Sequence, residues 1–210
     1  MDAMENEHTQ PAIAGIVLAS GMSRRFGAGN KLLARFGGQS VISCTVQAYI
    51  DARLAPLLVV VGYQAEEIVE ALNGRPIQVV PNPDFLQGQS RSLRHSLLAL
   101  PEGTAAAVIG VGDQPLLRPE TIRSLIDEYH RSDAPLVLPC YAGQRGNPVL
   151  FDSRLFPELL CVEGDQGGRS VIQRYLGEAA LVDVTDARSG ADIDTEDELA
   201  HLALRTRRTD

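Results

Sequence analysis

The sequence lacks the features of a nucleic-acid-binding, secreted or membrane-spanning protein. Its 210 residues carry 27 acidic and 19 basic side chains, a formal net charge of −8, whereas nucleic-acid-binding domains usually show a basic surplus or stripe. No apolar run approaches the roughly 18 residues that cross a membrane. The first ten residues, MDAMENEHTQ, have neither the basic start nor the apolar centre of a secretory signal. We therefore expect a cytoplasmic protein that binds neither nucleic acid nor membranes.

Cysteine and histidine are too scattered for a zinc-type site. Cys44, Cys140 and Cys161 lie far apart and form no CxxC pair, and the four histidines show no zinc-ligand spacing. We expect the cysteines to be reduced thiols, buried or half-buried. These absences do not exclude a metal held by carboxylates.

Lysine is almost absent from the chain. Of the 19 basic residues, 18 are arginine, and the single lysine is Lys31. An arginine bias also arises from genome composition, so the count alone assigns no role. The position is more informative, because Lys31 follows a glycine-rich stretch where a compact ammonium group suits a phosphate.

Short apolar runs alternate with helical patterns roughly every 20–30 residues, which is typical of βαβ units. The runs predict strands at residues 12–19, 56–62, 76–80, 105–113, 135–139, 147–151 and 181–185. Helices are expected at residues 40–51, 65–72, 90–100 and 119–129, within 165–176, and from about 195. Parallel strands with right-handed crossovers predict a three-layer α/β/α sandwich with a mostly parallel, Rossmann-like central sheet. We expect one domain, residues 12–210, behind a loose tail of residues 1–11.

The loop after the first strand has the composition of an anion site. Residues 18–31, LASGMSRRFGAGNK, combine glycine and serine with Arg24, Arg25 and Lys31. Backbone N–H groups in such a turn form a nest for anions. The spacing matches neither a P-loop nor a GxGxxG dinucleotide fingerprint. Because ligands of open α/β sheets bind beyond the carboxyl ends of the strands, the loop is either a phosphate site or an ordinary solvated turn.

Two acidic motifs are candidates for metal ligands. Asp113, in VGDQP, follows the fourth strand at the same sheet edge as the glycine-bearing loop. A carboxylate there suits Mg²⁺, which takes one or two carboxylates plus substrate phosphates. In ADIDTED, Asp192 and Asp194 would point to one face of an extended segment, and Thr195 begins a helix. Turn formation and helix capping are the competing structural roles for these aspartates.

Three further segments are either substrate contacts or surface turns. QGQSRSLRHSL begins with Gly88 and Ser90 at a helix start that could face a ligand, and it carries Arg91 and Arg94 on one helical face. GQRGNP, residues 143–148, predicts a hairpin turn or a substrate loop. GDQGGR, at 164–169, predicts a turn or part of a substrate pocket.

Taken together and in this order, these motifs resemble the MobA-like nucleotidyltransferase family, over about residues 13–203. LASGMSRRFG…K is similar to the family's nucleotide loop LAAGxSxRMGxxK, with Ser20 replacing the second alanine and Phe26 the methionine. GQSRSL resembles GMSxSL, VGDQPLL the GDQPLL metal motif, and DIDTEDEL the DIDTPEDL segment. RGNPVLF and GDQGGRS are most similar to RGHPVLF and GDxGAR of the molybdenum cofactor cytidylyltransferases, with Asn147 replacing histidine.

The resemblance implies a fold of the nucleotide-diphospho-sugar transferase type and transfer of CMP from CTP to the terminal phosphate of molybdopterin, releasing pyrophosphate. The implied metal is Mg²⁺ or Mn²⁺, held by Asp113 with Asp194 as the favoured second ligand and Asp192 as the alternative. The implied catalytic residues are Lys31, Arg25 and Asp113. The implied nucleotide-binding residues are Leu18, Ala19, Ser20, Gly21, Ser23, Arg24, Arg25, Lys31, Gly88 and Ser90. The implied acceptor-binding residues are Gln114, Arg145, Gly146, Asn147, Asp165 and Arg169.

The partners implied by the resemblance are CTP, the molybdenum cofactor and a molybdenum hydroxylase that receives the product. Two alternatives stay open. One is a guanylyl- or other nucleotidyltransferase with a different base or acceptor, since base choice depends on the loops at residues 19–21 and 82–95. The other is a non-catalytic cofactor-binding chaperone on the same fold, which the retained Lys31, Asp113 and Asp194 disfavour.

Overall fold

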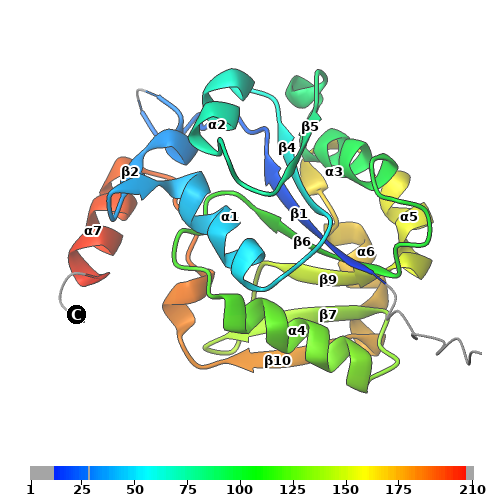
Figure 1. The fold of residues 1–210 in the computed structure, drawn as a ribbon. Helices are drawn as coiled ribbons and strands as arrows, with labels where there is room; N and C mark the ends of the chain where they lie inside the picture. The colour runs from blue at the N-terminus through cyan, green and yellow to red at the C-terminus, as the bar shows by residue number, and fades with distance from the viewer. Residues whose placement is uncertain (1–11, 28, 207–210) are drawn as a thin grey trace, which may run out of the picture.

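The structure is a computed structural model that describes residues 12–27 and 29–206; the expected tail, residues 1–11, lies outside them. An eight-stranded sheet runs in the order β10-β7-β9-β6-β1-β4-β5, with β8 paired to β7 (Figure 1). Its strands are β1 (Ile13–Ala19), β4 (Leu57–Val61), β5 (Gln78–Pro81), β6 (Ala106–Val111), β7 (Leu136–Tyr141), β8 (Gln144–Arg145), β9 (Val149–Asp152) and β10 (Ala180–Val184). A small hairpin joins β2 (Arg35–Phe36) to β3 (Gln39–Ser40).

Helices lie on both faces of the sheet. They are α1 (Val41–Asp51), α2 (Ala65–Ala71), α3 (Gln89–Leu98), α4 (Pro119–Arg131), α5 (Phe156–Leu160), α6 (Arg169–Tyr175) and α7 (Glu196–Thr206). Single 3-10 turns are η1 (Lys31–Leu33), η2 (Phe85–Gln87), η3 (Ser153–Leu155), η4 (Gly164–Gln166), η5 (Leu176–Glu178) and η6 (Ala187–Gly190). Ser40, at the start of the helix expected over residues 40–51, caps α1, because its side chain accepts a hydrogen bond from the Ser43 N–H.

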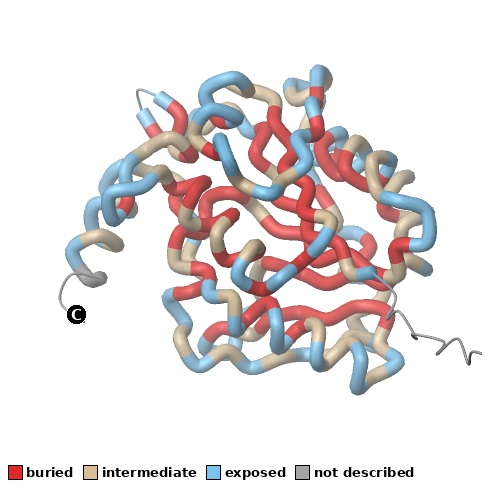
Figure 2. Tube along the Cα trace, viewed as in Figure 1, coloured by how far each residue is buried: buried red, intermediate tan, exposed pale blue. Residues whose placement is uncertain are grey.

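Side-chain alternation along the strands builds two separate cores. Val17 and Ala19 of β1 point into a cluster with α1, α2 and α4, whereas Ala14 and Ile16 point into a cluster with α3, α5 and α6. The central strands are therefore buried on both faces, as Figure 2 shows by the continuous buried colour along them. The predicted three-layer α/β/α sandwich is confirmed.

The sheet is mostly parallel, and two of its strands, β8 and β9, pair antiparallel with their neighbours. The pairs β1–β4, β1–β6, β4–β5 and β7–β10 are parallel. Strand β9 pairs antiparallel with both β6 and β7, and β8 pairs antiparallel with β7. The reason is the short β7–β8 hairpin, which returns the chain directly and lets β9 insert between β6 and β7 without a crossover helix. The hairpin predicted for GQRGNP is thus present. The prediction of a mostly parallel sheet is confirmed, and the antiparallel pairs are those of β8 and β9.

The register aligns the carboxyl ends of four strands at one edge. Ala19 pairs with Val61, Val61 with Pro81, and Leu18 with Val111. The chain passes from β1 outward to β4 and β5 and then returns to β6 on the other side of β1, so the strand order reverses between β1 and β6. A crevice at such a reversal is the usual ligand site of open α/β sheets.

A third, smaller cluster attaches α7 to the rest of the molecule. Phe26, Phe36, Val41 and Ile193 form its buried centre, against which Leu199, Leu202 and Ala203 of α7 pack. In Figure 1, α7 and β2 lie together at the left of the sheet. The backbone N–H of Ile193 donates to the carbonyl oxygen of Asp113 at 3.0 Å. This contact holds the segment before α7 against the carboxyl end of β6.

The exposure of the cysteines agrees only in part with the prediction from the sequence. All three cysteines are free, but only Cys44 and Cys140 are half-buried; Cys161 is exposed, because it caps the short helix α5 at the surface. The expected burial of Cys161 is wrong. Among the helices of residues 12–27 and 29–206, none has the length and apolar composition needed to cross a membrane.

Candidate active site

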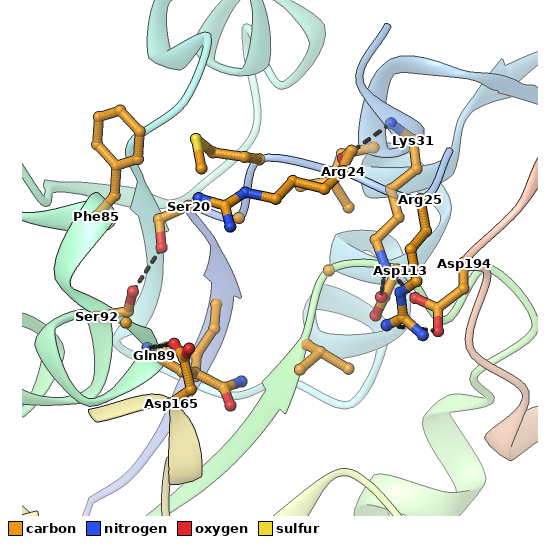
Figure 3. A pocket seen from close by; sticks show the side chains of 18 of the residues that line it. Ser20, Arg24, Arg25, Lys31, Phe85, Gln89, Ser92, Asp113, Asp165 and Asp194 are labelled. Atoms are coloured by element: carbon orange, nitrogen blue, oxygen red, sulfur yellow. Dashed lines mark hydrogen bonds and ion pairs between the residues drawn. The ribbon is translucent and has the colours of Figure 1, made fainter. Parts of the chain in front are cut away.

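A cavity of about 430 Å³ opens at the edge where β1 and β6 end. Its walls come from the loop after β1, from residues 85–92 around the start of α3, from residues 111–113 after β6, and from Asp165 and Asp194. Figure 3 shows two polar ends: Ser20, Ser92, Gln89 and Asp165 lie at one, and Arg25, Lys31, Asp113 and Asp194 at the other. Arg24 extends across the space between them.

The charged end joins two cations to two carboxylates. Lys31 Nζ contacts Asp113 Oδ2 and lies 3.0 Å from Asp194 Oδ1, and Arg25 Nη2 lies 2.9 Å from Asp194 Oδ2. Burial would lower the pKa of Lys31, but the Asp113 and Asp194 carboxylates outweigh it and raise that pKa above its ordinary value. Lys31 therefore stays protonated and positively charged in the pocket.

Asp113 keeps one carboxylate oxygen unused. Asp113 is 9% exposed, and its Oδ1 is buried without a hydrogen-bond partner in the described part of the chain. Within that part, no three His, Cys, Asp or Glu side chains gather into a complete metal cage. Two carboxylates facing an open pocket fit Mg²⁺ or Mn²⁺, which prefer oxygen ligands and complete their coordination with phosphates and water. Asp113 and Asp194 are thus the residues that could hold such an ion.

Asn30 fixes the loop that carries Lys31. Its side-chain Oδ1 accepts hydrogen bonds from Ser23 Oγ at 3.1 Å and from the Leu32 N–H at 3.0 Å. The Lys31 N–H in turn donates to Ser23 Oγ at 3.1 Å. Asn30 is 5% exposed. The sequence motifs assigned Asn30 no role, although asparagine before a helical turn is a capping signal.

A chain of polar side chains defines the other end of the pocket. Ser20 Oγ and Ser92 Oγ are 2.5 Å apart, and Asn82 Nδ2 donates to Ser92 Oγ at 3.0 Å. All three residues are buried. The motifs did not predict Ser92, although it is part of the GQSRSL segment, and they did not predict Asn82. Asn82 directly follows β5, whose end the register places at this edge.

Gly88 and Asp165 close the pocket beside Ser92. Gly88 has φ +104°, and a Cβ there would lie 2.6 Å from Asp165 Oδ1, so glycine is required on both counts. The Gln89 N–H donates to Asp165 Oδ1 at 3.3 Å. Asp165, expected at the acceptor, therefore lies against the first turn of α3 and lines the same pocket as the glycine-bearing loop.

A capping box orients the segment that carries Asp194. Glu198 Oε2 accepts from the N–H of Asp194 at 2.8 Å and of Thr195 at 3.0 Å, and the Glu198 N–H donates to Thr195 Oγ1 at 3.2 Å. The predicted helix start at Thr195 is thus present. It fixes the backbone on which the Asp194 carboxylate reaches Lys31.

Asp192 lies near this end but does not line the pocket. Solvent reaches its side chain. Partial desolvation by the surrounding protein, followed by the charge of Asp113, raises the pKa of Asp192 to about 6. The structure thus brings Asp194, rather than Asp192, into contact with Lys31.

The structure brings many of the sequence-predicted residues together and separates others. Those that line the pocket are Leu18, Ser20, Gly21, Ser23, Arg24, Arg25, Lys31, Gly88, Asp113, Asp165 and Asp194. Residues that line it without having been predicted are Met22, Leu32, Phe85, Leu86, Gln89, Ser92, Val111 and Gly112.

The remaining predicted residues lie elsewhere. Ala19 is buried in the core behind the loop, and Ser90 faces a second hollow beside Arg91 and Arg94 on α3. Gln114 is 1% exposed and donates to the Gly190 carbonyl oxygen at 3.1 Å. Arg145, Gly146 and Asn147 lie on or beside the β7–β8 hairpin, and Arg169 lies at the start of α6.

Replacing Glu198 by alanine should lower turnover about tenfold and stability by about 1 kcal/mol, because Asp194 and Thr195 lose their shared acceptor. Steady-state kinetics and urea unfolding would measure the two effects. Glu198→Gln keeps an acceptor oxygen and should retain most activity. Asp197→Ala, in the same helical turn, is the matched control; an equal loss of turnover there would show that the helix dipole, and not Asp194 orientation, is responsible.

Comparison with known proteins adds a family and several relatives. Residues 15–180 match the MobA-like NTP transferase domain family. Nicotine blue oxidoreductase of Paenarthrobacter nicotinovorans is 28% identical over 204 residues, covering 91% of this chain and 97% of its own. Purine catabolism protein PucB of Bacillus subtilis (strain 168) is 29% identical over 199 residues, covering 90% and 94%. The names of these two relatives describe different activities, so they select no substrate for this chain.

Solved structures share the fold along most of the chain. Rv0371c from Mycobacterium tuberculosis H37Rv is 28% identical with a TM-score of 0.81, covering 93% of this chain and 100% of its own. The same protein has also been solved in complex with manganese, at 27% identity and a TM-score of 0.74, covering 92% and 98%. A divalent metal therefore accompanies this fold in a similar protein.

Proposed function

Because the chain belongs to the MobA-like NTP transferase family and is thus a nucleotidyltransferase, we propose that it transfers CMP from CTP to the terminal phosphate of molybdopterin. The observation that carries the proposal is the charged end of the pocket. There Lys31 and Arg25 meet Asp113 and Asp194 at the edge where the strand order reverses. This end offers both the cations that bind a triphosphate and the carboxylates that hold a divalent ion.

The nucleotide lies along the pocket with its base toward Ser20 and Ser92 and its triphosphate toward Lys31. Backbone N–H groups after β1 and the side chains of Arg24, Arg25 and Lys31 bind the phosphate charge. In support, Arg24 and Arg25 both line the pocket, and no hydrogen bond or ion pair occupies Arg24 among the described residues. The Ser20–Ser92–Asn82 hydrogen bonds fix the polar atoms offered to the base.

The reaction forms one P–O bond and breaks another. An oxygen of the molybdopterin phosphate attacks the α-phosphorus of CTP in line, and the bond from the α-phosphorus to the bridging oxygen breaks, so pyrophosphate leaves with the bond electrons. Lys31 and Arg25 neutralise the charge that grows on the leaving group, and the loop holds the reacting atoms in line. No side chain forms a covalent intermediate. Asp113 and Asp194 would hold Mg²⁺ or Mn²⁺, which supplies Lewis-acid polarisation of the phosphates.

The acceptor lies on the β7 side of the same edge. Strand β9 is antiparallel to both β6 and β7, so β6 and β7 point the same way and the β7–β8 hairpin follows at the edge that carries Asp113. Arg145, Gly146 and Asn147 lie on or just after this hairpin. Gln114 directly follows Asp113, and Arg169 begins α6. Tyr141 Oη donates to the Asn147 carbonyl oxygen at 2.7 Å, which shapes this loop.

A molybdenum hydroxylase is the proposed recipient of the product. Free cysteines are consistent with a cytoplasmic location.

Pyrophosphate release tests the proposal directly. The protein is mixed with Mg²⁺ and molybdopterin, and CTP, GTP, ATP and UTP are compared, with Asp113→Asn as the blank. We expect release with CTP alone. Release with GTP would keep the mechanism but change the base. Release only with another acceptor, such as a sugar phosphate, would overturn molybdopterin as substrate, and no release with any pair would favour a non-catalytic cofactor-binding chaperone.

A further inference from the structure

The carboxylates that could hold a metal are already neutralised by the chain itself. Lys31 Nζ contacts one oxygen of Asp113 and lies 3.0 Å from one oxygen of Asp194. Arg25 Nη2 lies 2.9 Å from the other oxygen of Asp194. Of the four carboxylate oxygens, only Asp113 Oδ1 lacks a partner among the described residues. A single free oxygen is too little for a divalent cation that needs several oxygen ligands.

Lys31 is held in this position from both ends. Its backbone N–H donates to Ser23 Oγ, and Asn30 caps the turn that begins at Lys31. Its side chain is 17% exposed, compared with 76% for Arg25. The ammonium group therefore reaches the carboxylates through a largely buried stem, whereas Arg25 approaches Asp194 from solvent and contributes a weaker, screened contact.

A divalent cation and the Lys31 ammonium compete for the same two carboxylates. Both are positive, so they repel when they share ligands, and the partly buried position reduces the screening of that repulsion. The ammonium must find other anionic oxygens before the cation can use both aspartates. Phosphate oxygens of a nucleotide in the adjacent pocket are such partners.

We propose that Lys31 is the resident counter-ion of the Asp113–Asp194 pair and must move to the phosphates of the nucleotide before the pair binds a divalent cation. The identity of those phosphates rests on the proposed function; the competition between Lys31 and the cation does not. Metal and nucleotide then bind with strong positive coupling, since each favours the arrangement that the other needs. The nucleotide-free protein binds the cation weakly.

Mn²⁺ binding in the absence of nucleotide tests the competition. Free and bound Mn²⁺ are measured by electron paramagnetic resonance for the wild type, Lys31→Gln, Lys31→Arg and Arg24→Gln. We expect Lys31→Gln to bind Mn²⁺ at least tenfold more tightly than the wild type. Lys31→Arg keeps the cation and should stay close to the wild-type value. Arg24→Gln removes the same charge from the same pocket, but from a side chain that forms no ion pair with Asp113 or Asp194, and should change the affinity less than threefold.

Two outcomes would overturn the inference. One is equal Mn²⁺ affinity in the wild type and Lys31→Gln; the other is an equal gain in Lys31→Gln and Arg24→Gln, which would reflect general pocket charge. Lys31→Met, which keeps the apolar stem, replaces Lys31→Gln if the latter does not fold.

A second readout uses thermal unfolding. In chelator, Lys31→Gln should unfold at a lower Tm than the wild type, and saturating Mn²⁺ should raise its Tm by more. A larger Mn²⁺-induced rise of the Tm in the wild type than in Lys31→Gln would contradict the competition between Lys31 and the cation. These measurements need no nucleotide, so their outcome is separate from that of the activity assay. Tighter Mn²⁺ binding by Lys31→Gln, together with no pyrophosphate release by the wild type from any nucleotide, would overturn the proposed function and leave the competition between Lys31 and the cation standing.

Discussion

Replacing Asp113 by asparagine should lower kcat for nucleotidyl transfer about 10³-fold, the loss of several kcal/mol of charge stabilisation in the transition state. The asparagine side chain would keep the shape of the aspartate but lose the negative charge that faces Lys31. The backbone carbonyl oxygen at this position would still accept from the Ile193 N–H, so the fold and the placement of Asp194 should persist. The expected signature is a fall in kcat without unfolding.

Pyrophosphate release under saturating nucleotide measures this effect, and circular dichroism checks the fold. Asp127→Asn is the matched control, because Asp127 is an exposed aspartate of α4 that does not line the pocket. Its activity should equal that of the wild type. If Asp113→Asn kept more than a tenth of the wild-type kcat, Asp113 would not be a ligand on which transfer depends.

Replacing Gly110 by alanine should destabilise the protein by about 3 kcal/mol, because strand β6, which leads to Asp113, has no room for a Cβ at this position. The added atom would lie 2.2 Å from Tyr49 Oη and 3.0 Å from Pro148 Cβ. Tyr49 is fully buried in the core cluster under α1. Neither neighbour is the free end of an exposed side chain, so the core must shift.

The Tyr49 hydroxyl makes this prediction sharper. It is buried without a partner in the described part of the chain, so Tyr49→Phe should cost nothing or stabilise by about 1 kcal/mol. Because the closest contact is with this oxygen, the double variant should recover at least about 1 kcal/mol of the Gly110→Ala loss. Urea unfolding of the wild type, Gly110→Ala, Tyr49→Phe and the double variant gives the coupling free energy between the two positions. As a control, Gly177→Ala, where a Cβ meets no atom within 4 Å, should be near neutral. Additive effects of Gly110→Ala and Tyr49→Phe on the free energy of unfolding would contradict a clash between the new Cβ and the Tyr49 hydroxyl.

Strand and helix positions were predictable because each element carries its own local pattern. Val17 and Ile16 alternate between two cores, and that double burial produces the continuous apolar run read from residues 12–19. The insertion of β9 carried no such signal. A short apolar segment after a turn has the same composition whether it extends the sheet at its edge or enters between two strands.

The candidate site was predictable where it depends on strand ends, and unpredictable where it depends on register or on side-chain direction. The glycine-bearing loop and Asp113 follow strands whose carboxyl ends share one edge by topology. Asn82 reaches the same edge only because Val61 pairs with Pro81. Ser90 and Ser92 are two positions apart on α3, and only the helix rotation decides that Ser92 faces the pocket and Ser90 the opposite hollow.

The approach of Asp194 to Asp113 depends on long-range packing. Ile193 is fully buried with Phe26 and Phe36, and its N–H reaches the Asp113 carbonyl oxygen. Motif order indicated that both aspartates belong to one site, but no local sequence pattern predicts the distance between them. Packing in the small cluster beneath α7 sets that distance.

The same cluster divides the molecule into regions of unequal resistance to opening. The sheet rests on two large cores, whereas α7 rests mainly on a few apolar contacts around Ile193. We therefore expect α7 to open as a separate foldon in hydrogen exchange, at a small fraction of the free energy of global unfolding. Its detachment would carry Asp194 away while Asp113 stays beside the end of β6. A ligand that bridges the two aspartates would therefore act as a clasp between foldons and slow amide exchange along the whole of α7.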